Sequence, residues 1–486
     1  WLGGSGGGIG TSWSDVRSGG EPVRGRGGSS GIIPFIRVMD SQTLAVSQGS
    51  LRRGAAAAYL NVGHPEIEEF LEIRKPSGDF NRKSLNLHHG VVIPDLFMEF
   101  VEKDLDWALI DPKSQRCTKI VRARTLWQRI LELRVQTGEP YLLFEGNVHK
   151  NMGTVYEARG AWIKQSNLCS EIMLETSDDR SAVCCLASVN QRYFLQWSKV
   201  PGFIEDCLRF LDNVLEDFIT QTEGRRGFEK TRNSAVHERS VGLGVMGFHT
   251  FLQENMIPFE SAMAKVWNNK MFRFIRSEAD TANVRLAMAK GPCPDAAKLG
   301  LELRFSNMMA IAPTASISII AGQASPCIEP WNTNAYVHKT LTGSTVVKNQ
   351  TLDTWLRSQY TPVEVDEIWR DIVAARGSVL GHPMIPSDVQ EVFKTAWEID
   401  QRWIIDFAAD RAPLIDQGQS INLFLPADCD IFHLHMLHYS AWKKGLKSLY
   451  YLRSQSVQNA GVEADNKMER ATVLGRADYE ECLSCQ

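Results

Sequence analysis

A short stretch near the middle of the chain places a thiol, a carboxylate and an amide close together. In QSNLCSEI (165–172), Asn167, Cys169 and Glu171 occupy alternate positions, so on an extended backbone all three side chains point to one side. Polar groups clustered in this way are costly in an apolar core. The pattern predicts a reactive site, with the thiol doing radical or nucleophilic work, the carboxylate acting as base and the amide orienting the reactants. A buried cysteine beside a solvated glutamate is the alternative.

The last residues of the chain predict thiol–disulfide exchange. The sequence ends in ECLSCQ, where Cys482 and Cys485 form a Cys-x-x-Cys pair on a polar segment that begins at about residue 454. A flexible segment of about 30 residues has an r.m.s. reach of roughly 30 Å, and Cys-x-x-Cys lowers thiol pKa values and suits exchange. This indicates a tethered dithiol that enters a pocket and leaves again. A zinc site shared with another chain and an idle exposed pair are the alternatives.

A tethered dithiol needs an internal disulfide to reduce, and AVCCLASVN (182–190) offers two candidate cysteines. Cys184 and Cys185 are adjacent, so on a strand their side chains point to opposite faces. We therefore expect at most one of them to share a pocket with Cys169.

Two other segments contain residues suited to chemistry. In SLYYLR, Tyr450 and Tyr451 lie inside an apolar strand, where stacked phenols relay an electron and a proton; one core and one edge tyrosine is the alternative. In APTASISII (312–320), small and hydroxyl residues follow a strand. Backbone N–H groups there make an anion-binding nest, and the alternative is a turn capped by serine or threonine.

Composition limits the class of protein. The chain has 486 residues, a net charge of −4 and a pI of about 6.3, with 43% hydrophobic and 23% charged residues. These values are typical of a soluble globular protein and do not indicate nucleic acid or an anionic membrane as a partner. No apolar run approaches the roughly 20 residues of a membrane span. The 10 cysteines are too few for a disulfide scaffold and favour a cytosolic enzyme with reactive thiols.

The elements that must position these residues alternate between helical and strand patterns. This alternation predicts an α/β fold with a largely buried sheet, either open or closed into a barrel. Helical spacing of apolar residues covers 64–75, 93–104, 125–136, 202–221, 260–290 and 387–410, and β-rich runs cover 55–62, 90–94, 140–144, 308–313, 419–425 and 447–453.

Taken together, SNLCSEI, PTASIS, SLYYLR and the terminal Cys-x-x-Cys resemble the catalytic large subunit of class I ribonucleotide reductase, of a phage- or bacterial-like type. The resemblance covers essentially the whole chain. It implies that Cys169 becomes a thiyl radical that removes the ribose 3′ hydrogen, that Glu171 is the base for the 3′ hydroxyl and that Asn167 holds the substrate. Cys184, which precedes LASVN, matches one member of the reducing pair, and Cys185 is the weaker match.

The resemblance also implies ligands and partners. Tyr450 and Tyr451 match the pair that receives the radical from a separate dimetal small subunit, and Cys482 and Cys485 match the tail dithiol recharged by thioredoxin or glutaredoxin. The implied substrate is a ribonucleoside diphosphate, the effectors are dNTP and ATP, and the large subunit is a dimer. No covalently bound cofactor or metal is implied for this chain, and the implied location is the cytoplasm, of the host if a phage encodes the chain. The implied substrate-phosphate residues are Thr314, Ala315, Ser316 and Ile317, and the implied effector residues are Arg17 in SDVRSGG, with Gln48 and Arg52 in SQGSLRRGA.

The implied fold is a ten-stranded α/β barrel of the ribonucleotide reductase and glycyl-radical type. We expect the barrel over 1–453, with a glycine-rich specificity-loop region at 1–55, and a flexible redox tail over 454–486. The opening WLGGSGGGIG fails both the Walker A and the dinucleotide patterns and resembles a stretch that lies mid-chain in the family. The expectation is therefore a chain from a split or truncated protein, without the N-terminal strands and any ATP cone. An N-terminal companion fragment would supply the cysteine that pairs with Cys184.

Three alternatives stay open at this point. A cobalamin-dependent reductase shares the barrel and the cysteine pattern, but it makes its radical in place and has no need of adjacent tyrosines. A glycyl-radical enzyme needs a glycine loop near the C-terminus, for which VLGRAD is a poor match. A non-catalytic effector-binding fragment that works only in an assembly is the third.

Overall fold

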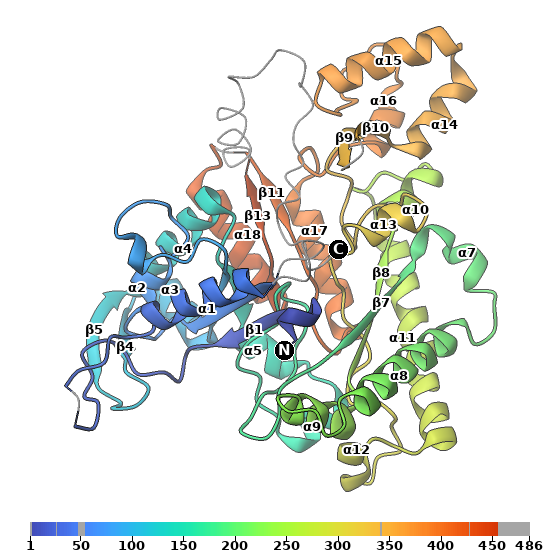
Figure 1. Ribbon diagram of the computed structural model, residues 1–486. Helices are drawn as coiled ribbons and strands as arrows, with labels where there is room; N and C mark the ends of the chain where they lie inside the picture. Colours follow the sequence, from blue (N-terminus) through green and yellow to red (C-terminus); the bar gives the residue numbers. More distant parts are fainter. Residues whose placement is uncertain (1, 26, 47–53, 341–342, 427, 455–486) are drawn as a thin grey trace.

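A mostly parallel sheet forms one side of the molecule (Figure 1). The computed structural model describes all residues except 1, 26, 47–53, 341–342, 427 and 455–486. Strands β2 (Ala55–Asn61), β3 (His88–Ile93) and β6 (Tyr141–Phe144) are buried almost throughout, as expected of parallel strands that are covered on both faces. The strands follow the order β1 (Gly8–Ser12), β2 (Ala55–Asn61), β3 (His88–Ile93), β6 (Tyr141–Phe144) and β12 (Ser448–Leu449), with β12 antiparallel to β6 and the others parallel.

A second series of paired segments lies beside the first. Strand β7 (Cys185–Asn190) pairs in parallel with β8 (Val241–Met246), and β11 (Leu423–Leu425) pairs in parallel with β13 (Leu452–Ser454). Isolated parallel bridges link Leu243 to Met309 and Ile311 to Gln419, and so connect the two pairs. Since β12 pairs with the first sheet and β13 with β11, residues 448–454 join the two series.

Helices cover the outside of these strands. Helix α8 (Phe203–Gln221) packs on α11 (Ala262–Lys290), β7 and β8, while α4 (Ala123–Thr137) packs on α3 (Asp95–Lys103) and α18 (Ile431–Lys443). Helix α11 begins where its apolar pattern predicts. At that point the Ser261 side chain caps the helix by accepting a hydrogen bond from the Ala264 N–H. The helices are α1 (Ile33–Ala45), α2 (Ile67–Phe70), α3 (Asp95–Lys103), α4 (Ala123–Thr137), α5 (Glu145–Lys150), α6 (Thr154–Arg159), α7 (Phe194–Trp197), α8 (Phe203–Gln221), α9 (Glu229–Glu238), α10 (Phe248–Glu254), α11 (Ala262–Lys290), α12 (Pro294–Lys298), α13 (Ile317–Ile320), α17 (Gln401–Arg411) and α18 (Ile431–Lys443).

Two peripheral units complete the chain. The antiparallel hairpin of β4 (Asp106–Ile110) and β5 (Cys117–Arg122) lies near α3, and Cys117 is exposed on it. A second hairpin with three helices forms a unit with its own apolar core. Its elements are β9 (Ala335–Thr340), β10 (Gly343–Lys348), α14 (Gln350–Gln359), α15 (Pro362–Ala374) and α16 (Ser387–Val392).

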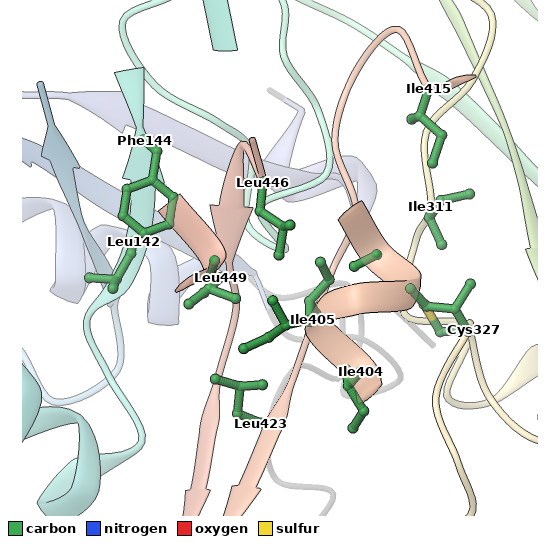
Figure 2. Close-up of a cluster of buried hydrophobic side chains, with 14 of the residues drawn as sticks. Leu142, Phe144, Ile311, Cys327, Ile404, Ile405, Ile415, Leu423, Leu446 and Leu449 are labelled. Carbon is green, nitrogen blue, oxygen red and sulfur yellow. The ribbon is translucent and has the colours of Figure 1, made fainter. Parts of the chain in front are cut away.

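Figure 2 shows how the apolar core joins the two series of strands. Leu446 and Leu449 lie between Leu142 and Phe144 of β6 on one side and Ile405 of α17 on the other. All of these side chains are buried, so strand and helix meet through a close-packed apolar contact. This core holds residues 446–449 firmly against β6, immediately before the two tyrosines.

Several predicted elements are shorter than the sequence indicated. The strand expected at 308–313 is reduced to bridges, because the Asp416 carboxylate accepts the N–H groups of Met308 and Met309 at 2.6 and 3.2 Å. The strand expected at 419–425 is regular only over β11, and the one at 447–453 is interrupted between β12 and β13 at the tyrosine pair.

Two predicted helices are also wrong in extent. Only α2 forms within 64–75, where four glutamates fall within seven residues at spacings that repel on a helix. The helix expected at 387–410 is divided into α16 and α17. The break occurs because Glu398 accepts the N–H and hydroxyl of Thr395, and Asp400 then caps α17 by accepting the Arg402 N–H.

Candidate active site

The segment with Asn167, Cys169 and Glu171 forms a tight turn. Residues 168–170 turn rather than extend, and Ser170 has a φ of 64°. The Asn167 amide closes the turn: its Oδ1 accepts the Glu171 N–H at 3.2 Å, and its Nδ2 donates to Glu171 Oε1 at 2.9 Å. The expectation of an extended strand was therefore wrong, although the amide and the carboxylate do meet. We call residues 166–173 the finger.

Cys169 lies at the tip of the finger and is fully buried. Its sulfur is in a disulfide in this structure. Chemistry at a thiol or thiyl group therefore starts from the reduced state.

Side chains from three distant segments anchor the backbone of the finger. Tyr59 of β2 donates its hydroxyl to the Asn167 carbonyl at 2.6 Å. Ser420 donates to the Cys169 carbonyl at 2.6 Å, and Ser448 of β12 donates to the Ser170 carbonyl at 2.8 Å. Each hydroxyl satisfies a buried carbonyl that no regular ladder reaches. The turn is thus fixed on both sides of the cysteine.

Glycines let two backbone segments approach the finger. A Cβ on Gly10 of β1 would lie 1.8 Å from the Ser166 carbonyl oxygen, and one on Gly8 would lie 3.0 Å from Leu168. A Cβ on Gly418 would lie 3.1 Å from the carbonyl oxygens of Ser170 and Glu171. The glycine-rich start of the chain is therefore an ordered strand packed directly against the finger.

Replacing Gly10 with alanine is expected to destabilise the protein by about 1–3 kcal/mol, because the new methyl group must displace either β1 or the finger backbone. Gly4→Ala is the matched control, since a Cβ there meets nothing within 4 Å. Urea unfolding of both variants and the parent measures the difference. Equal urea midpoints for the two variants would mean that the close approach of β1 to the finger does not contribute to the free energy of unfolding.

Glu171 is a buried carboxyl group with few partners. It is 1% exposed, and it accepts from Asn167 Nδ2 and, at 3.3 Å, from the Ser420 hydroxyl. Burial raises the pKa of Glu171 to about 7, and these two hydrogen bonds oppose the shift. A carboxyl group with a pKa near neutrality can both take up and release a proton at physiological pH.

Cys184 is the cysteine that faces the finger. It packs, half-buried, against the apolar cluster that contains Cys169, whereas Cys185 packs against the other main cluster. This agrees with the expectation that at most one of the pair lies with Cys169. Burial raises the pKa of the Cys184 thiol, and a hydrogen bond from the Gln417 amide at 3.6 Å opposes that rise.

Tyr450 and Tyr451 are both buried, at 3% and 5% exposure, so the reading of one core and one edge tyrosine is wrong. Their ring centroids lie 4.2 Å apart, and Tyr141 of β6 lies 4.7 Å from Tyr450 and 5.1 Å from Tyr451. All three belong to the same cluster as Cys169. The aromatic rings and the cysteine thus belong to one buried cluster.

A buried polar group surrounds the hydroxyl of Tyr451. His88 Nδ1 lies 3.2 Å from that hydroxyl and 2.6 Å from Glu139 Oε1, while His89 Nδ1 lies 2.9 Å from Glu139 Oε2. Arg74 and His88 hold the pKa of Glu139 well below its usual range against its burial. These contacts orient the imidazoles and the outer tyrosine.

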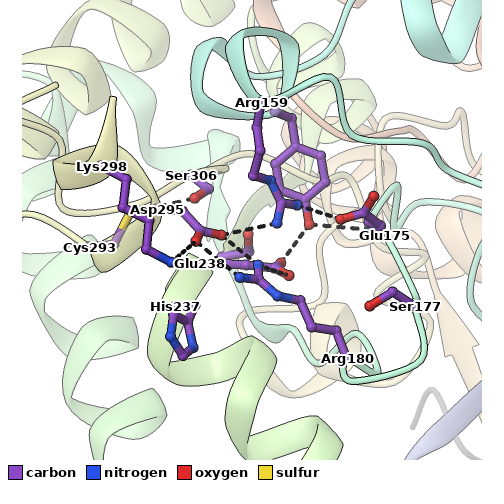
Figure 3. A network of polar contacts seen from close by, with 12 residues as sticks. Arg159, Glu175, Ser177, Arg180, His237, Glu238, Cys293, Asp295, Lys298 and Ser306 are labelled. Carbon is purple, nitrogen blue, oxygen red and sulfur yellow. Dashed lines mark hydrogen bonds and ion pairs between the residues drawn. The ribbon is translucent and has the colours of Figure 1, made fainter. Parts of the chain in front are cut away.

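The loop between the finger and Cys184 is held by the ionic network in Figure 3. Arg180 makes two contacts with Asp295, at 2.5 and 3.0 Å, and one with Glu238 at 3.3 Å. Tyr156 also donates to Glu238, at 2.5 Å, and Arg159 pairs with Asp295. Because Arg180 lies only four residues before Cys184, the network fixes the path that delivers this cysteine to the site.

Comparison with known proteins identifies the family. The family model described as "Ribonucleotide reductase, barrel domain" matches residues 2–302 and 295–452. The chain belongs to the ribonucleotide reductase family. The reductase is 40% identical over 489 residues to a Frog virus 3 (isolate Goorha) protein with a provisional assignment as a ribonucleoside-diphosphate reductase large subunit, covering 100% of this chain and 83% of that one.

Two further proteins agree on the large subunit. The Invertebrate iridescent virus 3 ribonucleoside-diphosphate reductase large subunit is 36% identical over 513 residues, covering 94% of this chain and 80% of that one. The solved α subunit of the Actinobacillus ureae class Id ribonucleotide reductase superposes with a TM-score of 0.80 at 32% identity, covering 93% of this chain and 79% of that one. The reductase is therefore a large subunit of class I, and these relatives are viral and bacterial.

The loop expected to bind substrate phosphates is a turn with three backbone N–H groups that have no acceptor among the described residues. Thr314 has a φ of 52°, and its hydroxyl accepts the Cys327 N–H at 2.6 Å. Within the described part of the chain, the N–H groups of Ala315, Ser316 and Ile317 have no hydrogen-bond acceptor. Helix α13 begins at Ile317 and has only four residues, so these N–H groups lie at the N-terminus of a short helix, as expected.

The expected effector and tail residues are only partly described. Arg17 lies in the loop after β1, where its guanidinium donates to the Pro22 carbonyl at 2.8 Å. Gln48, Arg52, Cys482 and Cys485 lie outside the described residues.

Sequence reasoning missed the residues that support the finger of the reductase. All four of these residues, Tyr59, Gln417, Ser420 and Ser448, are nearly or fully buried. Only Tyr59 interrupts an apolar run, where a buried hydroxyl needs a partner; the other three stand beside polar neighbours, so no sequence signal singled them out. The partner itself, the turn at Cys169, could not be read from any spacing.

The described residues contain no group of three or more His, Cys, Asp or Glu side chains arranged to hold a metal ion. Among the helices in that part of the chain, none combines the length and apolar character needed to cross a membrane.

Proposed function

We propose that this chain is the catalytic large subunit of a ribonucleoside-diphosphate reductase in which Cys169 carries a thiyl radical. The thiyl takes the 3′ hydrogen of the ribose, Glu171 takes the proton of the 3′ hydroxyl, and Asn167 holds the substrate. The 2′ hydroxyl leaves as water, and Cys184 supplies electrons as one half of a dithiol that becomes a disulfide. The observation that carries the proposal is the packing of Cys169, Cys184 and the tyrosine pair in one buried cluster.

The environment of Glu171 supports its role as the base. Its pKa of about 7 leaves the carboxylate available at neutral pH and still lets it hold a proton afterwards. The Asn167 amide and the Ser420 hydroxyl each donate to one carboxylate oxygen of Glu171, which fixes the position of the carboxylate beside the finger tip.

The tyrosines support a class I source of the radical. In this proposal Tyr451 and then Tyr450 pass the radical from a separate small subunit with a dimetal centre to Cys169. Ring centroids 4.2 Å apart are close enough for electron transfer. A cobalamin-dependent enzyme would make its radical in place, so it would not require this buried pair.

Other ligands and partners belong to the same proposal. Substrate phosphates bind the N–H groups of Ala315, Ser316 and Ile317, next to Thr314. Arg17, Gln48 and Arg52 bind dNTP or ATP effectors between two large subunits. Thioredoxin or glutaredoxin supplies electrons, and the enzyme works in the cytoplasm.

The finer architecture is also proposed. A continuous series of paired segments supports a ten-stranded barrel that spans 1–453, with the redox tail at 454–486. The series runs from β1 through β6, then through β12–β13, β11, 417–420 and 308–311, and ends with β8 and β7. A companion fragment that adds strands and a cysteine partner for Cys184 stays a prediction.

The tail cysteines test the redox part of the proposal. With Cys482 and Cys485 both changed to serine, the pre-reduced holoenzyme is expected to make about one product per site and then stall with thioredoxin, because the internal dithiol is no longer re-reduced. Product per site in a single-turnover assay, followed by steady-state rates, measures this. Substrate affinity should be unchanged. Sustained turnover with thioredoxin would show that the tail is not the electron carrier.

A further inference from the structure

The segment 416–420 forms the floor shared by the finger and Cys184. Gly418 donates its N–H to the Glu171 carbonyl at 2.7 Å, and Ser420 contacts both Cys169 and Glu171. Between these contacts and Cys184 stands Gln417, which is 0% exposed. A fully buried amide is retained only where its donors and acceptor are paired.

Contacts on both ends of the Gln417 amide determine which atom faces Cys184. Its Oε1 accepts the Met173 N–H at 3.2 Å, so the oxygen points to the finger. Its Nε2 donates to the Val241 carbonyl of β8 at 3.0 Å and to the Cys184 sulfur at 3.6 Å. A flipped amide would set oxygen against the Val241 carbonyl and nitrogen against the Met173 N–H. The sulfur therefore receives an N–H donor.

A lysine fixes the backbone from which Gln417 projects. Lys447 is 5% exposed, and its ammonium group donates to the carbonyls of Ile415, Asp416 and Gln417 at 3.1, 2.6 and 2.5 Å. The Asp416 carboxylate in turn holds the backbone of Met308 and Met309. The backbone at Gln417 is thus held by Lys447 and, through Asp416, by residues 308–309, while the Gln417 side chain is held by the finger.

The rest of the surroundings disfavour a charged sulfur at Cys184. Burial makes the largest contribution to the raised pKa of this thiol, and the carboxyl groups of Glu171 and Glu238 add to it, while the Gln417 hydrogen bond lowers it. A thiolate that accepts an N–H hydrogen bond is stabilised more than the neutral thiol.

We propose that Gln417 is the hydrogen-bond donor that holds the Cys184 sulfur and stabilises it as a thiolate during reduction of the oxidised enzyme. This rests on the proposed function of Cys184 as one half of the reducing pair. In the step, a thiolate of an external dithiol attacks the sulfur bound to Cys184. A new S–S bond forms there, the old S–S bond breaks, and its electron pair leaves on Cys184 Sγ, which accepts the Gln417 N–H. A proton from solvent then restores the thiol.

The direct test is the reactivity of Cys184 in the reduced full-length chain. Iodoacetamide alkylation is followed between pH 7 and 10 by peptide mass spectrometry, in a Cys185→Ser background so that the peptide reports Cys184 alone. Gln417→Met removes the donor while keeping the volume, and Gln417→Glu keeps the acceptor for the Met173 N–H. Both are expected to slow alkylation of Cys184 by about tenfold throughout this pH range.

Cys207 on α8 is the internal control, since it is also half-buried and has no contact with Gln417. Unchanged alkylation of Cys184 in both variants, or a parallel change at Cys207, would overturn the role of Gln417. Should Gln417→Met fail to fold, Gln417→Glu carries the test. Full turnover by Cys184→Ser would instead overturn the proposed function of Cys184, and it would leave the alkylation result standing.

Discussion

Replacement of Cys169 with serine is expected to abolish nucleotide reduction by the complete enzyme, with a loss of at least about a thousandfold. Serine has nearly the same size and accepts the same turn, so the finger should keep its contacts with Tyr59, Ser420 and Ser448. What disappears is the S–H bond, which a tyrosyl radical can oxidise, whereas a serine O–H bond is far harder to break homolytically. The rate of deoxynucleotide formation with the small subunit and a dithiol measures the loss.

Nucleotide affinity separates this chemical defect from a folding defect. Because the phosphate donors proposed at 315–317 do not involve Cys169, the dissociation constant for substrate should stay within about twofold of the parent. Cys185→Ser is the matched control, since that sulfur packs in the other apolar cluster and its loss should leave turnover nearly intact. Substantial reduction by the serine variant at position 169 would remove the radical role from this cysteine.

The residues of the finger were predictable by type, and their geometry was not. Asn167, Cys169 and Glu171 stand out because a thiol, an amide and a carboxylate lie within five residues. Alternation suggested a strand, but Ser170 adopts a positive φ and the Asn167 amide bonds back to Glu171. A side chain that closes a turn onto its own backbone competes with a ladder, and periodicity does not register that competition.

Long amphipathic patterns gave reliable helices. The predictions at 202–221 and 260–290 match α8 and α11 to within two residues at each end. The strand prediction at 308–313 failed because a single distant carboxylate replaced a regular ladder. Asp416 does so at Met308 and Met309, and this contact spans more than a hundred residues of sequence. No local signal indicates such a partner.

The supports of the site come from residues far apart in the chain. Gln417, Ser420 and Ser448 reach the finger from 244 to 278 residues away. Lys447 looks like an ordinary surface lysine in sequence, yet its ammonium group is buried against three carbonyls. Such assignments need the fold, because only the fold brings 415–420 and 447–448 to the base of the finger.

Glu171→Gln is expected to lower the turnover number by about 10²–10⁴, the usual range for loss of a general base. The amide keeps the size of the side chain and a contact with Asn167, so substrate affinity should change little. In the parent, turnover is expected to rise with pH through about 7, since the base acts only when its proton is lost. The variant should lose this acidic limb. Glu254→Gln, a surface carboxylate paired with Arg192, is the control for the change of charge.

Stability against pH gives an independent measurement on the same Glu171 variant. The pKa of Glu171 is about 7 in the native chain and near 4.5 when unfolded, so the native state binds the proton more tightly. The contribution of Glu171 to the free energy of unfolding is fully present below pH 4.5 and is lost as the pH rises through about 7. At pH 8 the ionised carboxylate therefore lowers the free energy of unfolding by up to about 3 kcal/mol, and Glu171→Gln should restore it. Urea unfolding at pH 5 and pH 8 should therefore show the variant gaining stability on the parent only at the higher pH. An equal difference in stability between variant and parent at both pH values would mean that Glu171 has an ordinary pKa. The proposal that Glu171 is a base with a pKa near neutrality would then be contradicted.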